Sequence, residues 1–221
     1  RAKDINKDQT YFLHEVSEKE FSKCIFPLDN LTKSEVRDIA LKNNLVTANK
    51  KDSVGICFVG EKNLKDFLSR FIEFKKGDIK DENDNIIGQH QGSILYTQGQ
   101  RQGLMIGGVK GKEELPWYVY KKDIPNNEIY VCQGGDNELL MNKGLYVEDI
   151  NFINDIEYKY PIKCSIQVRH QHTPVNCTIE KLSNEYKIMF EEPIRAIAPG
   201  QSAVFYDNEI CLGGGVICKT F

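Results

Sequence analysis

The chain has 221 residues, 40% of them hydrophobic, and a formal net charge of −3 at pH 7. This balance argues against a surface coated in positive potential, and so against strong non-specific binding of nucleic acid by the whole molecule. No apolar run approaches the roughly 18 residues of a membrane span, and the first residues lack the apolar core of a signal peptide, so we expect a cytoplasmic protein with no membrane partner.

The first third of the chain has the sequence pattern of helices. Ser17 and Glu20 have the spacing of a capping box, and Thr32 and Glu35 repeat it. Apolar side chains then recur at helical spacing over residues 64–72. Almost no strands accompany these helices to bury their apolar faces, so we expect the chain to begin in the middle of a domain.

After Gly77 short β-type segments replace the helical pattern, and from about residue 144 they become longer. The later strands are expected at 162–169, 175–182, 186–190, 203–206, 210–212 and 216–218. Turns every eight to twelve residues favour a barrel, because closure removes the exposed edges of many short strands. The patterns therefore predict an α+β fold in three parts: helical residues 1–72, a small β-rich central domain at 73–143 and a β-barrel at 144–221.

The cysteines indicate reduced thiols in the cytosol and no metal site. The chain has seven of them, an odd number, with no C-x-x-C and no zinc spacing. Cys57 differs from the others because glycines flank its short apolar run and Lys50, Lys51 and Lys62 lie nearby, which favours the thiolate. An inert, buried strand cysteine is the alternative interpretation of the same residues.

Two polar runs are candidates for contact with RNA. Lys7, Asp8 and Gln9 place a cation, a carboxylate and an amide before an aromatic pair, although a solvated turn explains them equally well. Arg169 and His170 end an expected barrel strand, where they could donate to or stack on RNA or could simply be a polar strand end. The glycine-rich stretch 99–108 lacks the G-x-G-x-x-G spacing, which excludes a dinucleotide site of that kind.

Taken together, these runs resemble the bacterial tRNA-specific 2-thiouridylases over nearly the whole chain. The resemblance is carried by N-K-D-Q-T-Y-F-L, F-P-L, K-K-D-S-V-G-I-C-F-V-G-E, Y-T-Q-G-Q-R-Q-G-L, P-W-Y-V, P-G-Q-S-A-V-F-Y and C-L-G-G-G. It implies that residues 1–72 end an α/β ATP-pyrophosphatase domain of the HUP type, followed by the central domain and a tRNA-binding barrel. The family uses ATP with Mg²⁺, but its S-G-G-V-D-S phosphate loop does not occur here, so we expect no cofactor site in this chain.

The resemblance also implies a reaction: ATP-dependent transfer of sulfur from a cysteine persulfide to C2 of the wobble uridine of tRNA through an adenylated intermediate. Cys57 matches the persulfide carrier. The positions that match tRNA contacts are Lys7, Asp8, Gln9, Arg169, His170, where the family usually has Tyr, and Gln201. The implied partners are tRNA and a persulfide donor protein of the sulfur-relay or cysteine-desulfurase type, with no DNA.

Two other functions remain open from the sequence. In one, the barrel binds RNA and this polypeptide performs no chemistry. In the other, a thiol-redox protein is built on Cys57, although no resolving cysteine lies near it in the sequence. Under all three interpretations, we expect that the chain alone neither binds ATP tightly nor thiolates tRNA.

Overall fold

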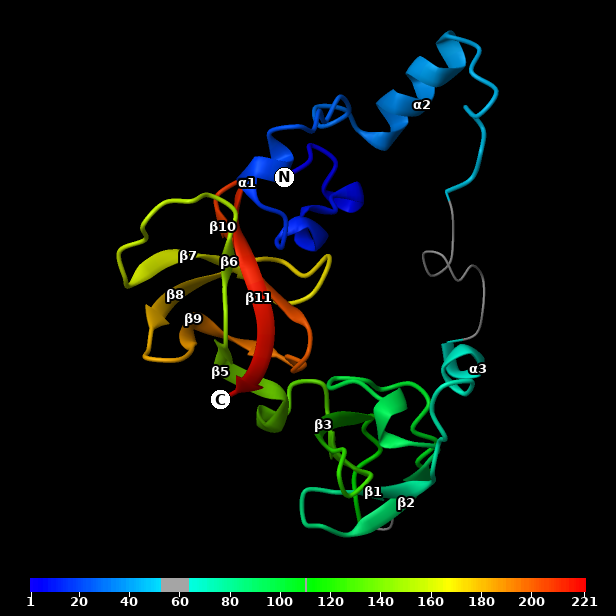
Figure 1. Ribbon diagram of the computed structural model, residues 1–221. Coiled ribbons are helices and arrows are strands. Elements are labelled where there is room, and N and C mark those ends of the chain that lie inside the picture. The colour runs from blue at the N-terminus through cyan, green and yellow to red at the C-terminus, as the bar shows by residue number, and fades with distance from the viewer. Residues whose placement is uncertain (53–63, 110) are drawn as a thin grey trace. The chain divides into compact units, whose positions relative to one another are not determined.

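The computed structural model describes residues 1–52, 64–109 and 111–221 (Figure 1). Clustering of contacts divides the chain into two compact units, which we describe separately. The barrel unit comprises Arg1–Lys51, Asn142–Ile194 and Pro199–Phe221, and the central unit comprises Asp52–Met141 and Arg195–Ala198. The first fifty residues thus group with the barrel, whereas the sequence placed them in a separate part with residues 52–72.

The N-terminal helices begin at the two expected caps. The backbone N–H of Ser17 donates to Glu20 Oε2 at 3.0 Å, and that of Thr32 donates to Glu35 Oε2 at 2.6 Å. Each N-cap therefore satisfies helix-end hydrogen-bonding groups that the helix itself leaves open. The elements are η1 (Ile5–Lys7), η2 (Thr10–Leu13), α1 (Glu18–Phe21) and α2 (Lys33–Lys42).

The expected C-terminal β-barrel is confirmed. Its strands are β5 (Met141–Val147), β6 (Asn151–Phe152), β7 (Ile162–Gln167), β8 (Val175–Lys181), β9 (Tyr186–Arg195), β10 (Ser202–Asp207) and β11 (Ile210–Thr220). The sheet runs in the order β10-β7-β8-β9-β5-β11-β6, and an additional pairing of β10 with β11 closes six of the strands into a ring. Closure leaves those six strands without a free edge.

Strand β11 corrects one detail of the prediction. Two short strands were expected at 210–212 and 216–218, but the chain continues as one strand through the three glycines between them. A Cβ on Gly214 would lie 2.5 Å from the carbonyl oxygen of Ala203 and 2.9 Å from the ring of His14. The glycines therefore do not end the strand; they allow neighbouring segments to approach it closely.

The central unit is a four-stranded sheet with its own core. It consists of β1 (Gly77–Lys80), β2 (Ile86–His90), β3 (Trp117–Asp123) and β4 (Glu128–Gln133), in the order β2-β1-β4-β3, with α3 (Leu64–Leu68), η3 (Ser93–Leu95) and η4 (Glu138–Leu140). Alternate residues of β3 and β4 are buried with Ile79, Tyr96 and Leu104. Each strand thus has one face in the core, as its sequence alternation indicates.

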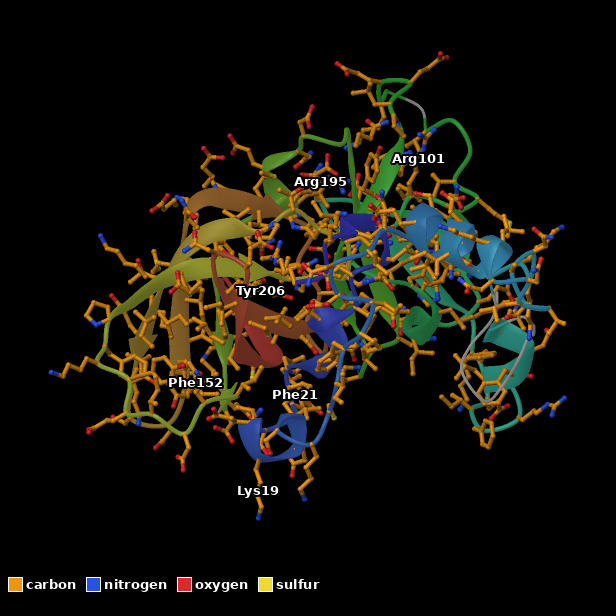
Figure 2. All side chains as sticks on the ribbon, turned by 90° about the horizontal axis from the view of Figure 1, so that it is seen from above. Lys19, Phe21, Arg101, Phe152, Arg195 and Tyr206 are labelled. Atoms are coloured by element: carbon orange, nitrogen blue, oxygen red, sulfur yellow. The ribbon has the colours of Figure 1, made fainter. Side chains whose placement is uncertain are left out.

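Strand β10 of the barrel unit is buried on both faces. Ala203, Val204, Phe205 and Tyr206 are four consecutive residues that are 0% exposed, although successive side chains of a strand point to opposite faces. Tyr11 packs against Val204 and Tyr206, so the N-terminal residues cover the second face. Figure 1 shows this blue segment beside β10 and β11, and Figure 2 shows Tyr206 next to it.

Candidate nucleic-acid interface

Several hydrogen bonds hold the N-terminal segment, residues 1–17, on the barrel, and we call it the docked segment; three of these bonds involve Tyr11 and His14. The Tyr11 hydroxyl donates to the carbonyl oxygen of Ser202 at 2.8 Å, and His14 Nε2 lies 2.9 Å from Ser202 Oγ. The Asn151 amide donates to the carbonyl oxygen of His14 at 2.8 Å. Ser202 and Asn151 are 188 and 137 positions from His14 in the sequence, so the contact is tertiary and no local pattern predicts it.

Burial changes the acidity of both anchoring side chains. His14 is 4% exposed, and this burial lowers its pKa, an effect only partly opposed by Glu15 and by the backbone of Gly214. For Tyr11, burial has the opposite sign and raises the pKa, whereas the hydrogen bonds with Ser202 and the charge of Arg169 lower it by less. The neutral form of each side chain is therefore the one that fits this contact.

The docked segment brings together two groups of residues that the sequence singled out separately. His170 Nε2 lies 3.0 Å from the backbone carbonyl oxygen of Asp8, across 162 positions of sequence. A carbonyl oxygen only accepts, so Nε2 must carry the hydrogen and the ring has a defined orientation. The run at residues 7–9 and the barrel pair Arg169–His170 consequently form one surface.

The carboxylate of Asp8 is engaged within its own segment. Its Oδ1 accepts hydrogen bonds from the backbone of Thr10 at 3.0 Å and of Ala2 at 3.5 Å, and also one from the Thr10 hydroxyl. Burial raises the pKa of this carboxyl, but the hydrogen bonds outweigh it and the net pKa is lowered. Asp8 therefore stays ionised and shapes the turn that carries Lys7 and Gln9.

The remaining predicted contact residues lie around this junction. Lys7, Gln9 and Arg169 are exposed, and Gln201 is half-buried beside Ser202, the residue that anchors Tyr11 and His14. Arg169 is near enough to Tyr11 for its charge to affect the pKa of the hydroxyl. All six predicted tRNA-contact residues are thus in the barrel unit, on or next to the docked segment, and their roles remain predictions.

Cys57 lies outside the described residues. The six other cysteines are free thiols. Burial raises the pKa of Cys132 to about 11, and the neighbouring Cys164 thiol together with burial raises that of Cys177. Cys164 and Cys177 face one another on β7 and β8 with their sulfurs 3.6 Å apart. Cys132 and Cys177 are therefore poor thiolates at neutral pH, as expected of structural cysteines.

Three residues where the docked segment meets the barrel have no role assigned by the sequence motifs. Tyr11, Phe12 and His14 follow the K-D-Q run directly, and the aromatic pair was noted only as its neighbour. The ring of Phe12 lies 4.6 Å from that of His170, centroid to centroid, and 5.3 Å from that of Tyr11. Only Phe12 of the three is exposed, and the signal that could have identified it is an aromatic residue close to a lysine in the sequence.

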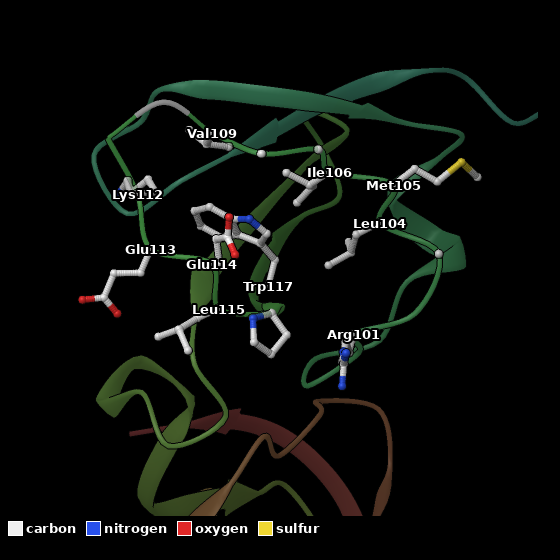
Figure 3. Close-up of a pocket in the computed structure, with 14 residues that line it drawn as sticks. Arg101, Leu104, Met105, Ile106, Val109, Lys112, Glu113, Glu114, Leu115 and Trp117 are labelled. Carbon is white, nitrogen blue, oxygen red and sulfur yellow. The ribbon is translucent and has the colours of Figure 1, made fainter.

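A hollow lies in the central unit, lined in part by the glycine-rich stretch. It has a volume of about 660 Å³ and is lined by Leu104, Leu115 and Trp117, among others. Figure 3 shows the Leu104 side chain directed toward Trp117 across the hollow, whereas Glu113 and Met105 point away from it. Over the described ranges, no three His, Cys, Asp or Glu residues are grouped so as to hold a metal ion, and no helix is long and apolar enough to cross a membrane.

Comparison with known proteins assigns each part of the chain. Residues 1–61 match the tRNA methyl transferase HUP domain, 65–133 the tRNA methyl transferase PRC-barrel domain and 142–217 the aminomethyltransferase β-barrel domain. The tRNA-specific 2-thiouridylase MnmA of Pseudomonas fluorescens Pf-5 is 49% identical over 97% of this chain and 57% of its own length. That of Buchnera aphidicola is 47% identical over 97% and 58%. The chain spans somewhat more than half the length of these relatives, and over that span it belongs to the tRNA-specific 2-thiouridylase family.

Proposed function

We propose that this chain is the tRNA-binding and sulfur-carrying part of a tRNA-uridine 2-sulfurtransferase that acts in the cytoplasm. The observation that supports it most is the contact between Asp8 and His170, which joins two sequence runs that resemble family tRNA contacts into one surface. The names of the relatives, tRNA-specific 2-thiouridylases, agree with that assignment.

On this surface the side chains divide by chemistry. Lys7 and Arg169 supply positive charge for phosphate groups, and Gln9 and Gln201 carry amides that can donate to and accept from a base edge. His170 donates through Nε2 to Asp8, so a hydrogen bond from this ring to a ligand would be made through Nδ1. A local group of this kind accommodates RNA on a protein whose net charge is negative.

Cys57 is proposed as the sulfur carrier. Its thiolate would attack the terminal sulfur of a donor protein's persulfide, forming a persulfide on Cys57 while the donor leaves as its thiolate. The lysines at positions 50 and 51 favour the attacking thiolate. The finer step, attack of that sulfur on C2 of an adenylated wobble uridine, rests on the family resemblance alone.

The described residues do not fit a nucleotide site. Helices α1 and α2 begin at Ser17 and Thr32 caps and not at a glycine-rich phosphate loop. We therefore assign no step of ATP or Mg²⁺ chemistry to these residues, and we expect the 221-residue chain alone not to thiolate tRNA.

Sulfur uptake distinguishes this proposal from an RNA-binding module without chemistry. The chain is incubated with a cysteine desulfurase and cysteine, alkylated, and digested, and the Cys57 peptide is weighed. We expect one added sulfur atom on Cys57 and none in Cys57→Ser, whereas Cys24→Ser, which removes an exposed thiol, keeps the label. Failure of Cys57 to gain sulfur would leave only the binding module.

Binding to tRNA tests the other half of the proposal. Arg169→Ala should weaken binding by about 1–3 kcal/mol if the side chain reads a base edge, or lower the log-log salt slope by about one if it contacts phosphate. Arg101→Ala removes an exposed arginine of the central unit and is the matched control. Equal binding by the Arg169 and Arg101 variants would contradict the assignment of this surface.

A further inference from the structure

The side chain of Phe12 is an exposed aromatic ring on the proposed tRNA surface. It is 60% exposed, although the residues on either side of it are buried or half-buried. Most of the ring is therefore open to solvent and accessible to a ligand.

Neighbouring residues hold this ring in one place. Its centroid lies 5.3 Å from that of Tyr11 at an interplanar angle of 88°, an edge-to-face contact, and 4.6 Å from that of His170 at 42°. Tyr11 is itself fixed through its hydroxyl to Ser202, and His170 through Nε2 to Asp8. The three rings are therefore an organised cluster whose outermost member faces solvent.

Charge around the cluster favours a particular kind of ligand. Lys7 and Arg169, both exposed, lie on the segments that supply Phe12 and His170. Two carboxylates lie close to Phe12 in the sequence: Asp8, whose Oδ1 accepts from the backbone of Thr10 and Ala2, and Glu15, which is exposed. An aromatic face with cations at its edge binds the flat face of a nucleobase whose phosphates reach those cations.

We propose that Phe12, supported by His170 and Tyr11, is a stacking platform for one unpaired base of the bound RNA. The inference rests on the proposed function and adds to it a requirement for an unstacked nucleotide. Bases inside a duplex are already stacked on their neighbours, so a platform of this kind selects loops and single-stranded ends over helices. It contributes by ring contact and not by charge.

The test measures binding of the 221-residue chain to an RNA hairpin with an unpaired loop and to a blunt duplex of the same stem. Phe12→Ala should weaken hairpin binding about 5- to 150-fold, the range for loss of one base–aromatic stack, and leave duplex binding unchanged. Phe12→Tyr should bind as the parent chain does, whereas Phe12→Leu, which keeps an apolar side chain, should behave as Phe12→Ala. The salt slope of hairpin binding should be the same in all of them.

Phe26→Ala is the matched control, because it removes another exposed aromatic ring of the same unit. Hydrogen exchange of residues 202–217 should be unaltered in Phe12→Ala, which shows that the docked segment remains in place. Equal hairpin binding by Phe12→Ala and the parent chain, with Arg169→Ala still weakened, would overturn the platform and leave the proposed function intact. If Phe12→Ala instead lost persulfide uptake and kept RNA binding, the platform would be overturned in favour of a contact between Phe12 and the donor protein.

Discussion

Two stretches of the first fifty residues differ sharply, although both were expected to be helical. In residues 1–17, the docked segment, Tyr11 is 7% and His14 4% exposed, and both are bonded to the barrel. In residues 22–51, the helical segment, α2 has no buried residue, and Ile25 and Val46 are 88% and 101% exposed. The difference shows that regular helix and burial are independent here: the less regular stretch is the one anchored by tertiary contacts.

The largest expected effect comes from truncating the anchor of the docked segment. Tyr11→Ala removes a buried ring and its hydrogen bond to Ser202, and should lower the free energy of unfolding of the barrel unit by about 3–5 kcal/mol. Phe26→Ala in the helical segment should change it by less than about 0.5 kcal/mol, because that ring is exposed. Hydrogen exchange in denaturant, read on barrel peptides, measures both. Similar losses for the two variants would remove the distinction between the segments.

A smaller effect is expected from filling the space that His14 occupies. Gly214→Ala places a methyl group 2.5 Å from the Ala203 carbonyl oxygen and 2.9 Å from the imidazole, and should cost about 1–3 kcal/mol. Gly108→Ala, where no atom lies within 4 Å of the added carbon, is the control. Unchanged exchange of the docked segment in Gly214→Ala would mean that its contact with β11 is not tight.

In the helical segment the expected effects stay local. Thr32→Ala removes the side-chain acceptor for the Glu35 N–H and should weaken α2 by about 1 kcal/mol. No residue of α2 is fully buried, and its bonds to the docked segment join Glu35 to Lys3 and Lys33 to Asp4, so exchange of β10 and β11 should be unaltered. Protection measured separately for residues 33–42 and 202–217 checks this, and a parallel loss in both would show that the two segments are coupled.

The smallest expected effect concerns pH. Because the pKa of His14 is lowered in the folded protein, the unfolded chain binds the proton more readily. The contribution of His14 to the free energy of unfolding is therefore fully present above about pH 6.5 and is lost as the pH falls below that value. His90 has a lowered pKa through burial as well, and it lies in the central unit with Trp117, the chain's single tryptophan. His14→Gln should flatten the pH dependence of the barrel peptides but not that of the tryptophan fluorescence. An unaltered slope in the barrel peptides would exclude His14 as its source.

Local chemistry explains which parts of the fold the sequence predicts. The two capping boxes lie within four residues each, and the alternation along β7 and β8 repeats every second residue, so both are visible without tertiary information. Strand β11 was divided in error, because a run of glycines commonly ends a strand, and only the approach of His14 and Ala203 explains why it does not here.

The candidate surface was predictable in its members but not in its assembly. Lys7, Asp8, Gln9, Arg169, His170 and Gln201 could be named from motifs. No spacing indicates that Asp8 meets His170 or that the Tyr11 ring lies on β10. Such contacts depend on the shape of a barrel that the sequence predicts only as a class, and Phe12 was overlooked for the same reason.

The pairing of the first residues with β10 also has a consequence for the order in which the protein is made. The backbone nitrogen of Arg1 donates to the carbonyl oxygen of Glu209, and His14 Nε2 lies 2.9 Å from Ser202 Oγ, so 208 and 188 positions of sequence separate these partners. A ribosome makes Tyr11 191 residues before Ser202, so the segment of Tyr11 and Phe12 has no barrel to dock on until β10 and β11 have emerged. Until then those aromatic side chains lack their contacts with the barrel, and the proposed RNA-binding surface is completed only after β10 and β11 have been made.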